Sequence, residues 1–526
     1  MKPNFVIIAL IYLCACANVL AQGTGEEKPD EVQVNVLPKK GLKFDPKAIY
    51  REDQAVLQGI FGTNGDDEIN ALEVMPSKCI LAAGKIGTPQ EIVPAVVRSV
   101  IKGLSGTGNA FVAVFDPAFR NLEKIAFMPP EVATLRFARL GKDGAVYLGG
   151  DQAGNKGLVV LKIDANFSQL IWKVNTIGDF MTGMAVMPDN SVVVSPSNSP
   201  FISHIRSDGG GLIPFGKEQY FRTDAANPQV FQKYYVELGY KAKGMSISGY
   251  NEGGTGGVAV TADGNLVYFT TNRVRDRGGE PDFDPMLLKF TTAGEIIWIT
   301  NLVQGLPAPS DQKNARMYVD HYSGDLILAC NQHGHFGPGH DLIVTPGCYL
   351  TTDSWLSGDV FLGWIGRIDA ETGKVKAATM YFPDLQRPSI AGKRTANSLF
   401  IEGLCTDQSG RIYLAGATAY KLATTPNAFQ PEPLGGNAFL SVFDPKLTSI
   451  IYAGFITAQG YGVRAKRVAV TDLGPVVSTQ VTPGQGQPYL VTANIEKTNF
   501  LKPSASGMEN IMLSLFPSMN WFEDSQ

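Results

Sequence analysis

The chain repeats one pair of hairpins along most of its length. The first hairpin is clearest in Arg136–Gly149, Gly257–Phe269 and Gly403–Gly416, where two apolar stretches flank a tight polar turn. The second hairpin is clearest in Asn109–Pro117 and Asn437–Pro445, whose sequences are NAFVAVFDP and NAFLSVFDP. Gly, Asn and Asp tolerate the positive φ of such turns, so the apolar residues that alternate around them predict paired strands. Copies of this unit must stack, because one copy alone cannot bury its apolar faces.

Seven units can be counted, and each holds two hairpins and therefore four short strands. Weaker copies of the first hairpin complete the count, and their turns lie at Pro76-Ser77, Asp189-Asn190, Ser323-Gly324 and Leu473-Gly474. Four short strands repeated radially are typical of the blades of a β-propeller. The sequence therefore predicts an all-β fold, a β-propeller of about seven four-stranded blades over residues 66–526.

The length of the unit varies only at certain connections. If the strands of a blade are named a to d from the axis outward, the a–b and c–d turns stay short throughout. The b–c and d–a connections emerge on the opposite face of a propeller, and insertions confined to one face usually mark the binding face of a repeat protein. We therefore expect the function on the face that bears the long insertions, which are residues 85–107, 216–243, 272–285, 331–358, 383–397 and 417–436.

The first residues are typical of a secretory signal peptide over residues 1–21. Lys2 precedes an apolar run, Phe5–Leu13, and small residues lead to a cleavage site after Ala21. The apolar run is too short to span a membrane. We expect a secreted or periplasmic protein. The alternative is a lipid anchor at Cys16, because the residues that precede it resemble a bacterial lipobox.

The composition disfavours two kinds of partner. The formal net charge of −4 is small for 526 residues, so a basic surface for nucleic acid is not expected. No later segment is long and apolar enough for a transmembrane span. Residues 22–65 precede the first unit, and Val32–Val36 within them is predicted to be a strand that closes the ring against the last blade. Apolar residues at helical spacing predict short surface helices over residues 46–60 and 89–103.

The sixth unit also resembles a known family. Asn437–Pro445 and the following Ile450–Gly454 are similar to the SBBP-type bacterial β-propeller repeat, and so are Ile412–Thr418 and Thr425–Gln430. The resemblance implies a propeller fold and an exported bacterial protein of unassigned biochemistry. It implies no catalytic residues.

The b–c insertion of the fifth unit gathers histidines and cysteines. His333, His335 and His340 lie in a Gly-rich stretch, and imidazoles at this spacing can bind a transition metal. The alternative is that they are exposed loop residues without a ligand. Cys330 and Cys348 bracket the stretch, and an exported protein can keep a disulfide bond between them.

Two further features have both a structural and a functional interpretation. Cys79 and Cys405 fall within strands of other units and are expected to be buried apolar side chains rather than reactive thiols. The insertion 216–243 is rich in aromatic rings, which could stack on sugars or a partner protein, or form a small satellite core that holds the segment down.

Two functions fit these observations. The first is a non-enzymatic module that binds a protein or glycan partner through the insertion-bearing face. The alternative is a metal- or carboxylate-dependent hydrolase or lyase with its site at the mouth of the central channel on that face. Propellers host both kinds of function, so the fold does not decide between them. An enzyme should bring together polar groups with shifted pKa values, whereas a binding module should expose a partly apolar surface.

Overall fold

The computed structural model divides the chain into two units, residues 1–41 and 42–526. Several predicted features lie outside the residues that the structure describes: the signal peptide and Cys16, the strand at 32–36, the aromatic segment 216–243, and His335 and His340. The described residues are 55–62, 66–87, 97–196, 202–213, 246–248, 257–275, 281–303, 310–334, 342–351, 356–357, 361–388, 394–396, 398–418, 421–426, 428–433, 438–456, 462–482, 495–499 and 510–516.

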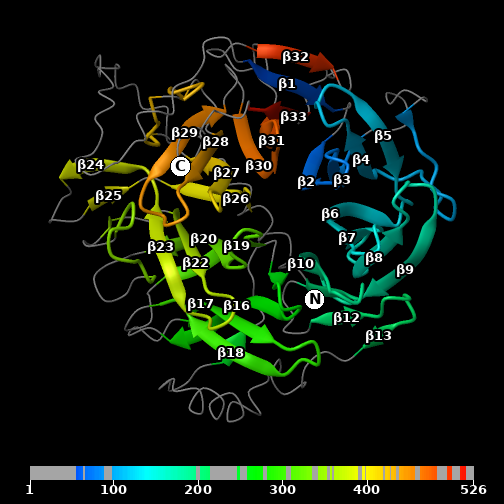
Figure 1. Ribbon diagram of the computed structural model, residues 1–526, viewed down its shortest axis with the longest axis horizontal. Helices are drawn as coiled ribbons and strands as arrows, with labels where there is room; N and C mark the ends of the chain where they lie inside the picture. The colour runs from blue at the N-terminus through cyan, green and yellow to red at the C-terminus, as the bar shows by residue number, and fades with distance from the viewer. Residues whose placement is uncertain are drawn as a thin grey trace, which may run out of the picture. The chain divides into compact units, whose positions relative to one another are not determined.

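Seven antiparallel sheets form a ring around a central channel, as predicted, and the described residues contain no α-helix (Figure 1). In each sheet the strands follow the order a to d from the axis outward. Blade by blade, they are β2 (Glu68–Val74), β3 (Ile80–Lys85), β4 (Ala110–Phe115) and β5 (Leu122–Phe127); β6 (Val132–Leu140), β7 (Val146–Gln152), β8 (Leu158–Ile163) and β9 (Leu170–Thr176); β10 (Met181–Val186), β11 (Val192–Pro196), β12 (Ser203–Ile205) and β13 (Leu212–Ile213); β15 (Val258–Val260), β16 (Leu266–Arg275), β17 (Pro281–Phe290) and β18 (Ile296–Asn301); β19 (Ser310–Val319), β20 (Leu326–Gly334), β22 (Phe361–Ile368) and β23 (Val375–Tyr381); β26 (Leu399–Thr406), β27 (Ile412–Thr418), β28 (Ala438–Phe443) and β29 (Ile450–Ile456); β30 (Gly462–Thr471), β31 (Gly474–Thr482), β33 (Asn510–Leu515) and β1 (Val56–Phe61).

The seventh blade closes the ring with strands from both ends of the chain. Its outer strand β1 pairs antiparallel with β33, and Gln58 Nε2 donates a hydrogen bond of 2.9 Å to Ser514 Oγ. A fifth strand, β32 (Ile495–Asn499), lies parallel to the other edge of β1. The propeller therefore includes residues that precede position 66, and the pairing predicted for residues 32–36 stays a prediction.

The two helices predicted from apolar spacing are wrong where the structure describes them. Val56–Phe61 is a strand whose six residues are all buried, and its sequence VLQGIF lacks a two-residue alternation, so the spacing alone does not tell a buried strand from a helix. Residues 97–103 make isolated bridges with the outer strands of the first two blades, Arg98 with Ile125 and Lys102 with Gln169.

The apolar core is divided into seven clusters, one between each pair of neighbouring blades. Between the seventh and first blades, for example, Phe61 packs against Phe111 and Phe115, with ring centroids 5.3 Å and 5.5 Å apart. Both faces of each sheet are therefore buried. This explains why a strand such as β4 is apolar along its whole length.

The tight turns require one residue in the left-handed region. In an a–b turn of the second blade this residue is Gly144, with φ 77°. In three c–d turns it is not glycine but Phe119, Phe167 or Leu447, with φ between 56° and 60°. All three side chains are buried, and burial worth about 1.5–3 kcal/mol offsets a backbone strain of about 1–3 kcal/mol.

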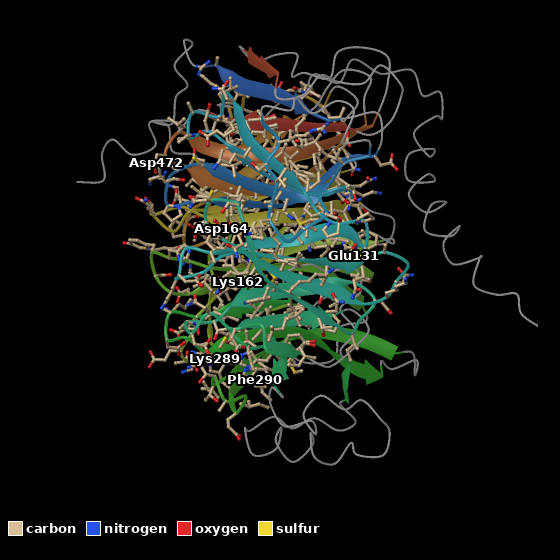
Figure 2. The ribbon with its side chains drawn as sticks, turned by 90° about the vertical axis from the view of Figure 1, so that its right-hand side faces the viewer. Glu131, Lys162, Asp164, Lys289, Phe290 and Asp472 are labelled. Atoms are coloured by element: carbon tan, nitrogen blue, oxygen red, sulfur yellow. The ribbon has the colours of Figure 1, made fainter. Side chains whose placement is uncertain are left out.

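The strand order gives the propeller two faces. We call the face with the a–b and c–d turns the turn face, and the face with the b–c and d–a connections the insertion face. In the side view of Figure 2, Asp472 and Asp164 of the turn face lie towards one edge, and Glu131 of a d–a connection lies towards the other. Part of the predicted insertion 272–285 extends the ladder of β16 and β17 to the pair Arg275 and Pro281. Small strands also occur among these connections, namely β14 (Ser246–Ser248), β21 (Leu356–Ser357), β24 (Asp384–Pro388) and β25 (Arg394–Ala396).

Candidate ligand-binding cavity

A β-bulge interrupts the innermost strand of six blades. An extra residue of the inner strand stands there without a partner on the b strand, which bends the strand and redirects side chains. In five of these blades the extra residue is polar. We call the five the inner-bulge residues: Asn70, Arg136, Thr182, Glu402 and Lys466.

Each bulge pushes the inner strand towards the b strand behind it, and glycine makes room for it in three blades. A Cβ added to Gly84, Gly150 or Gly416 would lie 1.8, 2.1 or 1.8 Å from a carbonyl oxygen of the inner strand. Each glycine pairs with the residue that precedes the bulge. The small residues at the ends of the repeated b strands in the sequence therefore have a structural cause.

A cavity of about 740 Å³ lies in the channel between β2, β6, β19, β26 and β30. It extends to the a–b turns of the last three blades, so it lies at the turn-face end of the channel. Among the described residues, β10 and β15 contribute nothing to its wall. Its wall contains four carboxylates, three guanidinium groups and one imidazole: Glu73, Glu402, Asp407, Asp472, Arg139, Arg316, Arg467 and His321.

Glu402 is the centre of the most buried ion pairs in this wall. Its carboxylate accepts a hydrogen bond of 2.7 Å from Arg316 Nη2 and a second one from Arg464. Arg316 Nε also donates to the backbone carbonyl of Glu402 at 2.7 Å. Burial alone would raise the pKa of the Glu402 carboxyl, but the two guanidinium groups hold it well below its usual value. Glu402 is therefore ionised whenever the chain is folded at neutral pH.

Several cations surround Glu402. Arg316, Arg464, Lys466 and Arg467 all act on its carboxylate. Removal from water and the charge of Arg316 lower the pKa of Arg467 to about 9. Arg467 donates to the backbone carbonyls of Glu402, at 3.0 Å, and of Lys466, at 2.6 Å. These contacts tie the inner strands β26 and β30 together at the cavity wall.

Two exposed apolar side chains adjoin, in sequence, residues that line the cavity on the turn face, namely His321, Asp472 and Gly474. Tyr322 and Leu473, in the a–b turns of the fifth and seventh blades, are 70% and 45% exposed. The His321 ring stacks edge-on against Tyr318, with centroids 5.7 Å apart. Glu73 pairs with Arg139, and burial raises the pKa of the Glu73 carboxyl although Arg139 opposes the shift. An aromatic and an aliphatic anchor beside a polar cavity is typical of a binding surface.

The structure does not bring the predicted metal ligands together within the part it describes. The backbone of His333 lies in β20 opposite Asp311 and Phe361. His335 and His340 fall outside the described residues. Within the described residues, no three side chains of the metal-binding types come together. Metal binding at His333, His335 and His340 therefore stays a prediction. Among the described residues, no helix is long and apolar enough to cross a membrane.

The cysteines agree with the expectation in part. Cys330 and Cys348 are separate thiols in this structure, and a disulfide bond between them stays a prediction. Cys330 is buried in the apolar cluster between the fourth and fifth blades, where burial raises its thiol pKa, and Cys348 Sγ donates to the carbonyl of Leu350. Cys405 is buried between the sixth and seventh blades as expected. Cys79 is only partly buried and lies just ahead of β3.

The cavity itself was missed by the sequence analysis. A usable signal was present, because charged residues stand in inner strands whose neighbours are apolar, as in Ile401–Leu404 and Ala465–Val468. A bulge breaks the two-residue alternation of a strand, so the side on which these charges lie could not be read from their spacing.

Comparison with known proteins identifies no family for the chain. No protein-family model matches the chain, and no curated protein matches it. One similar solved structure is the β-propeller domain of Cps50 (Swd1) from Myceliophteria thermophila, which is 9% identical with a TM-score of 0.40. That alignment covers 86% of this chain and 99% of the other. The fold therefore rests on the sheet order of this chain, and the likeness to SBBP-type repeats stays a resemblance.

Proposed function

We propose that the chain is an exported, non-enzymatic binding module whose protein or glycan partner docks on the turn face over the channel cavity. The observation that carries this proposal is the cavity of about 740 Å³ beside the exposed side chains of Tyr322 and Leu473. Scattered exposed apolar residues are ordinary on a protein surface, but two beside a polar cavity form an anchor for a partner. The partner classes come from the sequence analysis, in which the repeats resemble the SBBP type.

The sequence pointed to the insertion face instead, on the ground that insertions gather there. Much of that face lies outside the described residues. An experiment therefore has to decide whether the partner binds the turn face or the insertion face. Wild-type protein is screened against a glycan array and a displayed peptide library, and each ligand found is measured again with the variant Tyr322→Ser/Leu473→Ser. We expect a loss of affinity of at least about tenfold, because desolvated anchors carry most of the binding energy.

A matched control comes from the outer strands. Ile171 and Ile297 are 49% and 39% exposed, and they lie on β9 and β18, remote from the cavity wall. The variant Ile171→Ser/Ile297→Ser should bind as wild type does. If the rim variant binds normally and deletion of residues 335–340 abolishes binding, the partner uses the insertion face and the proposed location is wrong. A protein that binds no glycan and no peptide contradicts the proposal altogether.

One observation favours the alternative of a carboxylate-dependent hydrolase or lyase. Glu73 and Glu402 line the same cavity, and their pKa values are shifted in opposite directions. Such a pair can serve as general acid and ionised partner. However, Arg139 pairs with Glu73, and Arg316 and Arg464 pair with Glu402, so neither carboxylate is free to move a proton. Turnover of a glycoside or ester substrate by wild type that is lost in Glu73→Gln would establish the enzyme.

Export is tested separately. Intact-mass measurement of the protein released by its native host should give a chain that begins at Gln22. A mass that corresponds to a diacylglyceryl group on Cys16 would show the lipid anchor instead.

A further inference from the structure

The carboxylates and guanidinium groups of the cavity wall are engaged within the chain. Asp407 accepts hydrogen bonds from the backbone N–H groups of Ser409 and Arg411, at 2.8 and 3.0 Å. It also accepts one from the Tyr413 hydroxyl at 3.0 Å, and Arg467 donates to backbone carbonyls. The other three carboxylates form ion pairs, which are Glu73 with Arg139, Glu402 with Arg316 and Arg464, and Asp472 with Lys78. Each of these charged groups therefore has a partner before a ligand enters.

Uncharged polar groups of the same wall are still available. Tyr318, Gln408 and Ser409 line the cavity, and in the part of the chain that the structure describes no hydrogen bond involves the hydroxyl or amide group of their side chains. Gln408 is exposed, and the other two residues are partly buried. Hydroxyl and amide groups both donate and accept hydrogen bonds. They therefore suit a ligand whose own polar groups are hydroxyls.

Apolar side chains make up another part of the wall. Each of the five inner strands around the cavity contributes at least one of them, and the five include Leu72, Phe137, Met317, Leu404 and Val468. Tyr318 adds an aromatic ring that meets the His321 ring edge-on. A sugar residue carries hydroxyl groups around a ring with apolar C–H faces, so it matches a wall that offers both kinds of contact.

We propose that the channel cavity binds uncharged sugar residues, so that the partner is a neutral glycan. The inference rests on the proposed function and names the class of partner that enters the cavity. The cavity volume of about 740 Å³ lies within the range of about 300–1,000 Å³ that is typical of pockets for small ligands. A charged sugar would lose its hydration beside ion pairs that are already complete, and no free counter-charge would compensate for that loss.

Two substitutions remove the available polar groups with little disturbance. Tyr318→Phe removes one hydroxyl group and keeps the ring, and Gln408→Ala shortens an exposed side chain of an a–b turn. Neither change breaks a hydrogen bond of the described structure, so both variants should fold. Tyr147→Phe and Gln169→Ala are matched controls in the second blade, because neither residue lines the cavity. Circular dichroism checks the folding of all four variants.

Calorimetric titration of the full chain with neutral trisaccharides of glucose, mannose, xylose and N-acetylglucosamine tests the proposal. We expect saturable binding of at least one of them, with one site per chain. Loss of a hydrogen bond should raise its dissociation constant at least about threefold in each cavity variant and about tenfold in the double variant, and both controls should bind as wild type does. Trigalacturonate, which carries carboxylates, should bind at least about tenfold more weakly than the neutral trisaccharide.

The proposal is overturned if no neutral trisaccharide binds, if trigalacturonate binds as tightly, or if the double variant binds as wild type does. If Tyr318→Phe does not fold, Gln408→Ala still decides. The outcome is distinct from that of the proposed function. A chain that binds a peptide through Tyr322 and Leu473 but no glycan defeats only this inference. If the double variant loses the trisaccharide while Tyr322→Ser/Leu473→Ser keeps its affinity, only the proposed anchors are wrong.

Discussion

The inner and outer strands of the blades carry the same irregularity with different consequences. Five outer strands also contain a β-bulge. The extra residues there, which we call the outer-bulge residues, are Glu123, Ile171, Ile297, Lys376 and Ile451. Both kinds of bulge disrupt a sheet edge that could otherwise pair with another chain. Only the inner bulges coincide with a charged channel, and three of them have a glycine on the neighbouring strand.

The residues behind the two kinds of bulge show the difference in packing. Gly84, Gly150 and Gly416 stand behind inner bulges. Full side chains such as Phe115 and Ile163 adjoin the outer bulges. An inner bulge is therefore fixed from both sides, by the charges in the channel and by the backbone behind it. An outer bulge is fixed only by its own strand, so its side chain can vary.

The largest expected effect separates two glutamates that are both bulge residues. Glu402→Ala should lower the free energy of unfolding by about 3–5 kcal/mol, because it leaves Arg316 and Arg464 without their carboxylate in a buried site. Glu123 is exposed, and Glu123→Ala should change the free energy of unfolding by less than about 0.5 kcal/mol. Urea unfolding of both variants measures the difference. Equal losses would mean that the channel ion pairs contribute nothing.

Gly416→Ala tests the backbone behind the inner bulge. The added methyl group would overlap the carbonyl oxygen of Phe400, so the strand must shift. We expect a loss of about 1–3 kcal/mol, the usual cost of overpacking. Thermal unfolding followed by circular dichroism measures it. A variant as stable as wild type would show that the inner strand moves away without cost.

The stability of the inner cluster should also depend on pH. The pKa of the Glu402 carboxyl is lower in the folded chain than its usual 4.5, so below about pH 4.5 the unfolded state binds the proton first and stability falls. The difference in the free energy of unfolding between wild type and Glu402→Gln should therefore decrease as the pH falls below this value. The midpoints of urea unfolding, measured from about pH 3 to about pH 7, give this dependence of stability on pH. Glu123→Gln should follow wild type throughout.

The smallest effect is expected at an outer bulge. Lys376 pairs with Asp325 at 2.7 Å and Asp369 at 3.0 Å but is 46% exposed, so water screens both pairs. Lys376→Ala should lower the free energy of unfolding by at most about 1 kcal/mol. A much larger loss in urea would show that charge at the outer edge matters as much as charge in the channel.

The same contrast explains which parts of the structure the sequence predicts. Blade number and strand order follow from turns such as Asp143-Gly144 and Ser409-Gly410, whose chemistry is local. The bulges are not local, because their position depends on how an inner strand meets its neighbour. Glu402 and Lys466 are visible as charges in apolar strands, but a slip of one residue decides whether they face the channel or a blade interface.

The ring-closing strand shows a second limit of the sequence. Val56–Phe61 has no turn signal of its own and no alternation, because its blade neighbours cover both of its faces. Such a segment becomes a strand only because it pairs with another strand. Here that strand is far away in the sequence, since Gln58 and the Ser514 to which it donates a hydrogen bond are 456 positions apart. The local sequence around Val56–Phe61 therefore does not predict its pairing with β33.

That pairing has a consequence for how the protein is made. The seventh blade cannot be completed until β33 exists, so for most of synthesis β1 has no antiparallel partner and the ring stays open. Closure of so long a loop carries a large entropic cost before its contacts form, and contacts of this kind slow folding. A ribosome that stalls before residue 510 therefore releases a chain whose first strand is an unpaired edge. Such a fragment is prone to aggregation and proteolysis.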